Sequence, residues 1–260
     1  MVVKLLSCLV NQMRKVKFVT GEYYHIYNRG VDRRDIFLDG GDYGRFLTNL
    51  VEFNNDSTHD QRVYIKNRTE RTERTELSSD ASELSSVSDS RSLSDTSELS
   101  SRYRELSSVI ASLPNLVSIV DYCLNPNHFH LLLQQSVDKG IEKFMHKLGS
   151  GYTNFFNLKY ERSGSLFEGP FKAVKIDSEE HLLWVSAYVN GNAQIHGLVD
   201  DAEKYQWCSY HEYLGLTDTG ICNKEIILSQ YEDLEKFKKA SEDCFRQMKE
   251  KKDLQIYFLD

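Results

Sequence analysis

The feature that most constrains this chain is a turn followed by a short apolar run at residues 124–133, LNPNHFHLLL. Asn-Pro-Asn interrupts regular structure, and the run after it has the length and composition of a buried strand. Alternate side chains of a strand share a face. We therefore expect His128 and His130 to point one way, and Phe129 and Leu131 to point into a core on the other side.

Two interpretations of this histidine pair are open. Two neighbouring imidazoles are two ligands of a metal site that still needs a third ligand. They are equally two surface histidines on a half-buried strand, because a His-x-His pair is short and common. The rest of the chain has to decide between them.

The flanking sequence predicts an α+β protein. Aromatic and β-branched residues predict strands at residues 22–28, 61–66, 117–124 and 171–176. Apolar residues at three-to-four spacing predict helices at residues 42–53, 140–160 and 179–193. Asp42 is the expected cap of the first helix. Because the strands are close enough in sequence to pair antiparallel, we expect an antiparallel sheet with helices on one face.

The composition divides the chain. Residues 67–108 consist of Arg-Thr-Glu triplets and recurring Glu-Leu-Ser-Ser, and such a polar repeat buries too little apolar surface to offset the entropy of ordering. We expect a disordered insert there, within a single domain formed by residues 13–66 and 109–223. Residues 1–12 form an N-terminal extension, and residues 224–260 are expected to hold a charged, solvated helix.

Charge and cysteine content narrow the class of protein. The net charge of −7 excludes a uniformly basic protein, although basic residues outnumber acidic ones between residues 139 and 175. Such a tract can hold a phosphate backbone or be a solvated helix face. The 5 cysteines are scattered, with no C-x-x-C spacing, which fits a reducing cytosol. The apolar run at residues 2–10 is too short to span a membrane, and we expect no signal peptide.

A second set of polar residues lies on the predicted helix at residues 179–193. Tyr188 and Asn192 are four residues apart and would share one helix face. If that face approaches the histidines, two imidazoles and an amide oxygen would bind Mg²⁺ or Mn²⁺ with open positions. The cation would polarise a phosphate and Tyr188 would attack it. Without the histidines Tyr188 is an ordinary half-buried tyrosine; Tyr152 and Tyr160 are rivals, but neither has an amide one turn later.

Six short motifs follow one another along the chain: YHIYNRG at 24–30, PNHFHLL at 126–132, YTNFFN at 152–157, GSLFEG at 164–169, YVNGN at 188–192 and WCSY at 207–210. In this order they resemble the REP-associated tyrosine transposases, a branch of the single-tyrosine HUH (His-hydrophobe-His) transposases. Each motif is weak alone, whereas six in the family's order are specific. The resemblance leaves out the repeat insert and the C-terminal tail.

The resemblance implies a ferredoxin-like or RRM-like sheet of the HUH endonuclease fold. It implies that His128 and His130 are metal ligands, that Asn192 holds the position of the third ligand, and that Tyr188 is the nucleophile. The family acts on single-stranded DNA, recognises hairpins at palindromic repeats, and cuts by transesterification that leaves a 5′-phosphotyrosine and a free 3′-OH. The implied cofactor is Mg²⁺ or Mn²⁺. The implied protein is a cytoplasmic, nucleoid-associated monomer or homodimer.

A backbone-tracking DNA groove is expected where positive charge gathers. The predicted groove residues are Arg29, Arg33, Arg34, Lys143, Lys147, Lys172 and Lys175. Two alternatives to the transposase hypothesis stay open. One is a hairpin-DNA-binding protein of the same fold that has lost useful catalysis. The other is an unrelated metallohydrolase, which would place a carboxylate near the histidines and give Tyr188 no role.

Overall fold

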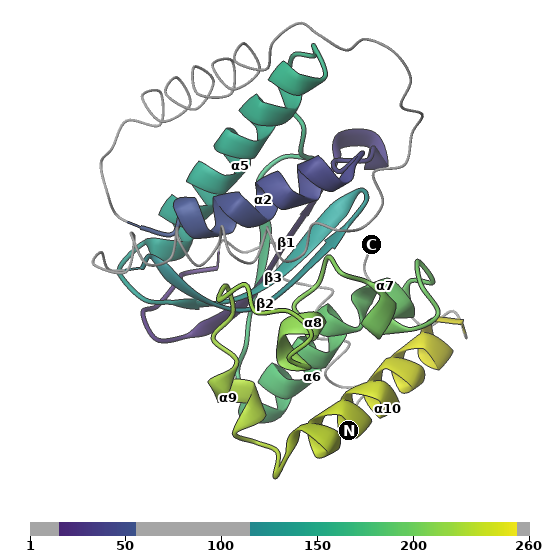
Figure 1. The fold of residues 1–260 in the computed structure, drawn as a ribbon. Coiled ribbons are helices and arrows are strands. Elements are labelled where there is room, and N and C mark those ends of the chain that lie inside the picture. Colours follow the sequence, from purple (N-terminus) through teal and green to yellow (C-terminus); the bar gives the residue numbers. More distant parts are fainter. Residues whose placement is uncertain (1–15, 56–114, 254–260) are drawn as a thin grey trace, which may run out of the picture.

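The computed structural model describes residues 16–55 and 115–253 (Figure 1). The predicted strand at 61–66 and the predicted insert at 67–108 lie outside these residues, as does the extension at 1–12. Within the described ranges, no helix is long and apolar enough to cross a membrane.

The described strands form one antiparallel sheet in the order β2-β3-β1-β4. The strands are β1 (Tyr23–Arg29), β2 (Val117–Asn125), β3 (His128–Gln135) and β4 (Lys172–Lys175). Helix α2 (Gly40–Glu52) follows β1, and helix α5 (Gly140–Lys159) follows β3. This β-α-β-β-α-β order is the ferredoxin-like arrangement, so the prediction of an α+β fold with an antiparallel sheet is confirmed.

A two-residue loop joins β2 to β3, as the Asn-Pro-Asn signal predicted. The carbonyl oxygen of Pro126 accepts backbone hydrogen bonds from Ile36 at 2.7 Å and from Phe37 at 3.0 Å. These bonds hold the hairpin turn against the segment that precedes α2. They fix the end of β3 at which His128 lies.

Helices α2 and α5 cover one face of the sheet (Figure 1). Phe129, Leu131 and Leu133 of β3 point into the buried cluster beneath them, together with Phe46 of α2 and Phe144 of α5. The alternation predicted for β3 is therefore confirmed on its core side, because burial of every second residue fixes which face each side chain takes.

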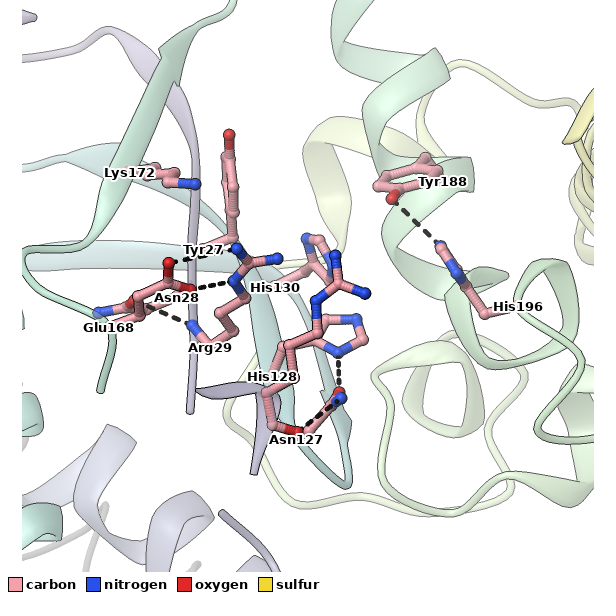
Figure 2. A pocket seen from close by; sticks show the side chains of 11 residues that line it. Tyr27, Asn28, Arg29, Asn127, His128, His130, Glu168, Lys172, Tyr188 and His196 are labelled. Carbon is pink, nitrogen blue, oxygen red and sulfur yellow. Dashed lines mark hydrogen bonds and ion pairs between the residues drawn. The ribbon is translucent and has the colours of Figure 1, made fainter. Parts of the chain in front are cut away.

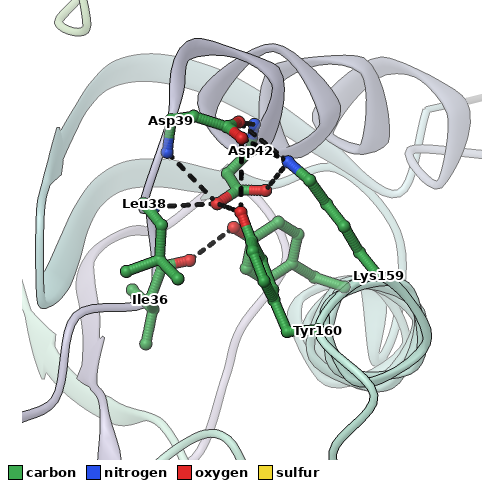
Figure 3. Close-up of polar contacts among 7 residues, drawn as sticks. Ile36, Leu38, Asp39, Asp42, Lys159 and Tyr160 are labelled. Atoms are coloured by element: carbon green, nitrogen blue, oxygen red, sulfur yellow. Dashed lines mark hydrogen bonds and ion pairs between the residues drawn. The ribbon is translucent and has the colours of Figure 1, made fainter.

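A polar cluster joins the start of α2 to the end of α5 (Figure 3). Asp39, and not the predicted Asp42, is the N-cap: its carboxylate accepts a hydrogen bond from the Asp42 backbone at 3.0 Å, and the Asp42 carboxylate closes a capping box. Lys159 lies 2.8 Å from both carboxylates, and the Tyr160 hydroxyl donates to Asp42 at 2.8 Å. Asp42 is fully buried, and these donors compensate the cost of burying its charge.

Helix α6 (Glu179–Asn190) covers the opposite face of the sheet, which corrects the expectation of helices on one face only. Leu132 of β3 is buried there against α6, with Val185 and Val189 in the same cluster. The β2–β3 hairpin is apolar on both faces, so each face needs a cover. The remaining described helices are η1 (Val31–Arg33), α7 (Asn192–Ile195), η2 (Ala202–Lys204), α8 (Tyr210–Tyr213), α9 (Glu225–Leu228) and α10 (Leu234–Asp253).

The C-terminal helix α10 is packed, whereas the sequence predicted a solvated helix. Phe237, Phe245 and Met248 are buried in the cluster that includes α6. Gly191, between α6 and α7, leaves space for the Phe245 ring, and a Cβ added at Gly191 would overlap ring atoms of Phe245. The sequence prediction missed these few apolar positions because most residues of α10 are charged.

A bulge in β2 adds a second connection between the sheet and α6. The register shifts between Ile119 and Asp121, and Asp121 faces α6, where its carboxylate accepts a hydrogen bond from the Asn190 amide at 2.7 Å. The Ser209 hydroxyl donates to the Asn190 oxygen at 2.7 Å. Burial raises the pKa of Asp121 to about 7, although hydrogen bonds oppose the effect.

Asp121→Asn should flatten the pH dependence of stability. The folded protein holds the Asp121 proton up to about pH 7, whereas the unfolded chain loses it near 3.8, so the wild type loses stability as pH rises between these values. The stability of the variant relative to wild type should increase over that range by up to about 4 kcal/mol, at about 1.4 kcal/mol per pKa unit. Urea unfolding at pH 4.5 and pH 8 measures this difference; an unchanged difference would contradict it.

Gly191→Ala should destabilise the protein by about 1–3 kcal/mol, because the added methyl group meets the fully buried Phe245 ring. Gly149→Ala is the matched control. Gly149 lies inside α5 with nothing within 4 Å of an added Cβ, so this change should stabilise by about 0.5–1 kcal/mol. Thermal unfolding of both variants checks the prediction, and equal effects would exclude the proposed contact.

Candidate active site

His128 and His130 lie on the α6 face of β3 and line a pocket of about 220 Å³ (Figure 2). Their ring centroids are 5.1 Å apart and their planes are nearly perpendicular, at 88°. The strand register places Arg29 opposite His128 and Tyr27 opposite His130. Residues opposite one another in an antiparallel pair share a face, so β1 and β3 build the floor of this pocket together.

Each imidazole of the pair is oriented through its Nδ1 atom. His128 Nδ1 lies 2.6 Å from the Asn127 amide oxygen. Since that oxygen can only accept, Nδ1 carries the proton and Nε2 holds a lone pair. His130 Nδ1 lies 2.9 Å from Nε2 of His25, a buried histidine on β1. Histidines that bind metals are commonly fixed in this way by a contact to the second ring nitrogen.

Burial favours the neutral form of His25 and His130. Burial, followed by the charges of His128, His25 and His196, holds the pKa of His130 well below its usual value. Burial, followed by the charge of His181, lowers the pKa of His25 to about 3. Neutral imidazole is the form that binds a metal ion.

Tyr188 of α6 lies beside the histidine pair. Its ring centroid is 5.5 Å from that of His130 and 6.0 Å from that of His25. Trp184, one turn earlier, stacks parallel to it at 5.9 Å and 4°. The Tyr188 hydroxyl lies 3.5 Å from Nε2 of His196, which also lines the pocket (Figure 2). The structure thus brings Tyr188 and both predicted histidines together.

The rival tyrosines lie elsewhere. Tyr152 is fully buried on the opposite face of the sheet, and its hydroxyl donates to the Ile36 carbonyl at 2.5 Å. The Tyr160 hydroxyl is engaged by Asp42. Tyr27 lines the pocket as well, with its ring centroid 5.8 Å from that of His130.

Asn192 is placed differently from the expectation. The predicted continuous helix is interrupted at Gly191, because α6 ends at Asn190 and α7 begins at Asn192. Asn192 is fully buried, and its oxygen accepts a hydrogen bond from the Asn125 amide at 2.6 Å. The same Asn125 nitrogen lies 2.9 Å from His128 Nε2. Asn192 is therefore linked to His128 through Asn125 and does not line the pocket.

Three pocket neighbours were missed in the sequence. His25 and Tyr27 alternate with the core residues of β1, so a period of two could have assigned them to the histidine face once the β1–β3 pairing was known. His196 follows Asn192 by four residues. It lines the pocket beside the histidine pair, where the sequence analysis expected Asn192. No carboxylate lies beside the histidines among the residues that line the pocket; its acid, Glu168, pairs with Arg29.

Basic residues also line the pocket. Arg29, Arg33 and Lys172 all line it, and the Lys172 ammonium lies over the Tyr27 ring at 5.8 Å from its centroid. The other predicted DNA-binding residues do not line it: Arg34, Lys143, Lys147 and Lys175.

Those other basic residues have different surroundings. Arg34 forms an ion pair with Asp32, and Lys175 with Glu22. Lys143 and Lys147 belong to α5, which covers the face of the sheet opposite the histidines. That these four basic residues bind DNA stays a prediction.

The described residues contain no group of three or more histidine, cysteine, aspartate or glutamate side chains that could hold a metal ion. The imidazole pair nevertheless fits the chemistry of a divalent cation, because the Nδ1 atom of each ring has a partner and the Nε2 atoms would be the ligands. Hard cations often take only one or two protein ligands and complete their shell with phosphate oxygens and water. A cation at His128 would compete with the Asn125 amide for Nε2.

Comparisons with known proteins agree with part of this description. Residues 87–192 match the family model of the IS200-like transposases. None of the curated proteins matches the chain. Among solved structures, a REP-associated tyrosine transposase bound to a REP hairpin matches with a TM-score of 0.47 and 12% identity, covering 79% of this chain and 86% of the other.

The family match contains β2, β3, α5, β4 and α6, and so includes both predicted metal-binding histidines and Tyr188. It ends at Asn192 and leaves out β1. Over residues 87–192, about two fifths of the chain, the sequence is therefore similar to the IS200-like transposases.

Proposed function

We propose that this chain is a metal-dependent, single-tyrosine nickase and strand transferase that acts on single-stranded hairpin DNA. The observation that carries the proposal is the position of Tyr188, whose ring lies 5.5 Å from that of His130 in a pocket that basic residues also line. The IS200-like family match supports the reaction class. The hairpin substrate rests on the family resemblance of the sequence motifs.

The reaction is a transesterification at a backbone phosphate. The Tyr188 oxygen forms a bond to phosphorus and loses its proton, while the bond from phosphorus to the 3′-oxygen breaks and that oxygen gains a proton. The product is a 5′-phosphotyrosine and a free 3′-OH. One phosphodiester replaces another, so the bond energy is kept, and attack by a 3′-OH on the phosphotyrosine rejoins the strand without ATP.

The side chains around Tyr188 prepare it for this attack. Trp184 holds the ring by stacking, and His196 lies where it orients the hydroxyl. His128 and His130 would hold the divalent cation, Mg²⁺ or Mn²⁺, through Nε2. When bound there, the cation would stabilise the charge that develops on the phosphate oxygens. Asn192 would support His128 through Asn125, and could act as the predicted third ligand only after Asn125 moves.

The basic residues of the pocket would hold the DNA backbone. Arg33 and Lys172 offer positive charge to phosphates on either side of the scissile one. Arg29 is engaged with Glu168, so a phosphate would compete with that carboxylate. Tyr27, beside Lys172, offers an aromatic surface on which a base can stack.

Tyr188→Phe should abolish a covalent protein–DNA adduct, because phenylalanine has no oxygen to attack phosphorus. The assay incubates single-stranded hairpin oligonucleotides, from palindromes flanking the gene, with protein and Mn²⁺ or Mg²⁺, and resolves adducts on a denaturing gel. His130→Ala should also lose the adduct through loss of the cation. Tyr160→Phe is the matched control and should keep it, because Tyr160 binds Asp42 away from the pocket.

The outcomes separate the candidate functions. An adduct that survives Tyr188→Phe would move the nucleophile to Tyr27, the other tyrosine of the pocket lining. Hairpin binding without an adduct in any metal would favour a binding protein that has lost catalysis. An adduct that survives both metal removal and His130→Ala would exclude the metal-dependent mechanism.

Lys172→Ala should weaken hairpin binding and reduce its salt dependence, in a Tyr188→Phe background that prevents cleavage. Each lost phosphate contact to a single strand lowers the slope of log K against log salt by about 0.7. Lys143→Ala is the control on the opposite face of the sheet. Fluorescence anisotropy across a salt series measures both slopes. A larger effect from Lys143→Ala would place the DNA on the α5 side instead.

A further inference from the structure

We infer that His25 is a positioning residue that fixes His130 with the Nε2 lone pair facing the pocket. The inference rests on the proposed metal-dependent function and goes beyond it, because His25 lies outside the segment that matches the transposase family. In this inference His25 supports His130, the proposed metal ligand, and does not bind the metal itself.

The contact between the two histidines is close and buried. His25 Nε2 and His130 Nδ1 are 2.9 Å apart, and the exposed fractions of the two side chains are 8% and 5%. The ring centroids are 5.1 Å apart with an interplanar angle of 19°. His25 is opposite Leu132 in the register, so it is the diagonal neighbour of His130 on the same face.

His25 also touches the other principal groups of the site. Its ring lies 5.2 Å from that of Tyr27 and meets the Tyr188 ring edge-on at 6.0 Å. These neighbours hold the His25 ring on both sides. A rigid ring is a better reference for orienting His130 than a mobile side chain on the surface.

The chemistry of the pair favours one arrangement of the protons. If His130 Nδ1–H donates to His25 Nε2, the Nε2 lone pair of His130 is free for a cation. Asn127 forces the same tautomer on His128, so both rings would present the same type of atom to one pocket. The opposite tautomer of His130 would point an N–H group at the cation site.

A histidine in this place has a physical advantage over the carboxylate that often supports a metal-binding histidine. A neutral imidazole accepts a hydrogen bond through its unprotonated nitrogen without adding negative charge. A carboxylate here would be a buried negative charge near an incoming phosphate, at a cost in both desolvation and repulsion.

The test measures Mn²⁺ binding to the full chain without DNA, by electron paramagnetic resonance of free Mn²⁺. His25→Phe keeps an aromatic ring but removes the acceptor, and should weaken binding about 10–100-fold, as loss of a supporting partner typically does. His25→Gln keeps an acceptor near the position of Nε2 and should restore most of the affinity. His146→Phe, on an exposed site of α5, is the control that should leave binding unchanged.

A second measurement needs no variant. Nitrogen-15 spectra of the histidine side chains in the wild type should show His130 protonated at Nδ1 and unprotonated at Nε2. A proton on Nε2, or Mn²⁺ affinity in His25→Phe equal to wild type, would overturn the role of His25 while leaving the transposase function intact. Failure of the wild type to bind Mn²⁺ would overturn both this role and the metal-dependent mechanism.

Discussion

The antiparallel register between β1 and β3 determines the site, because it brings residues that are about a hundred positions apart onto one face. It sets Arg29 opposite His128 and Tyr27 opposite His130, and β4 adds Lys172 opposite Tyr27. A shift of one residue would turn every side chain of β1 to the other face. The apolar partners on the core side resist that shift, so the packing of one face maintains the chemistry of the other.

The β2–β3 hairpin needs a cover on both faces, and this need determines where Tyr188 lies. Helix α6 buries its apolar side on Leu132 and so lies directly above the histidine strand. The Asp121–Asn190 contact and the docking of Phe245 beside Gly191 hold the end of that helix. The part of the chain after residue 192 therefore contributes to the position of Tyr188, and it also supplies His196 to the pocket lining.

The sequence predicted the structure correctly where the periodicity of neighbouring residues determines it. It failed where the structure depends on a contact with a residue far away in the sequence. A period of two oriented His128 and His130 correctly, and the Asn-Pro-Asn signal located the hairpin. The helical pattern through Asn192 gave no sign of the interruption at Gly191, where the neighbouring ring is that of Phe245, more than fifty residues later in the sequence. His25 was missed for the same reason, since only the pairing of β1 with β3 places it beside His130.

The distribution of charge across the pocket follows from burial. Burial favours the neutral forms of His25 and His130, which lie beside Tyr188. Arg29, Arg33 and Lys172 bring positive charge to the pocket lining, with Arg29 opposite His128 on the neighbouring strand. Under the proposed function, these basic residues would attract a phosphate, and no carboxylate of the pocket lining lies beside Tyr188. Stabilisation of the charge that develops on the phosphate would then depend on a cation held by the two histidines, so the proposal depends on how these rings are oriented.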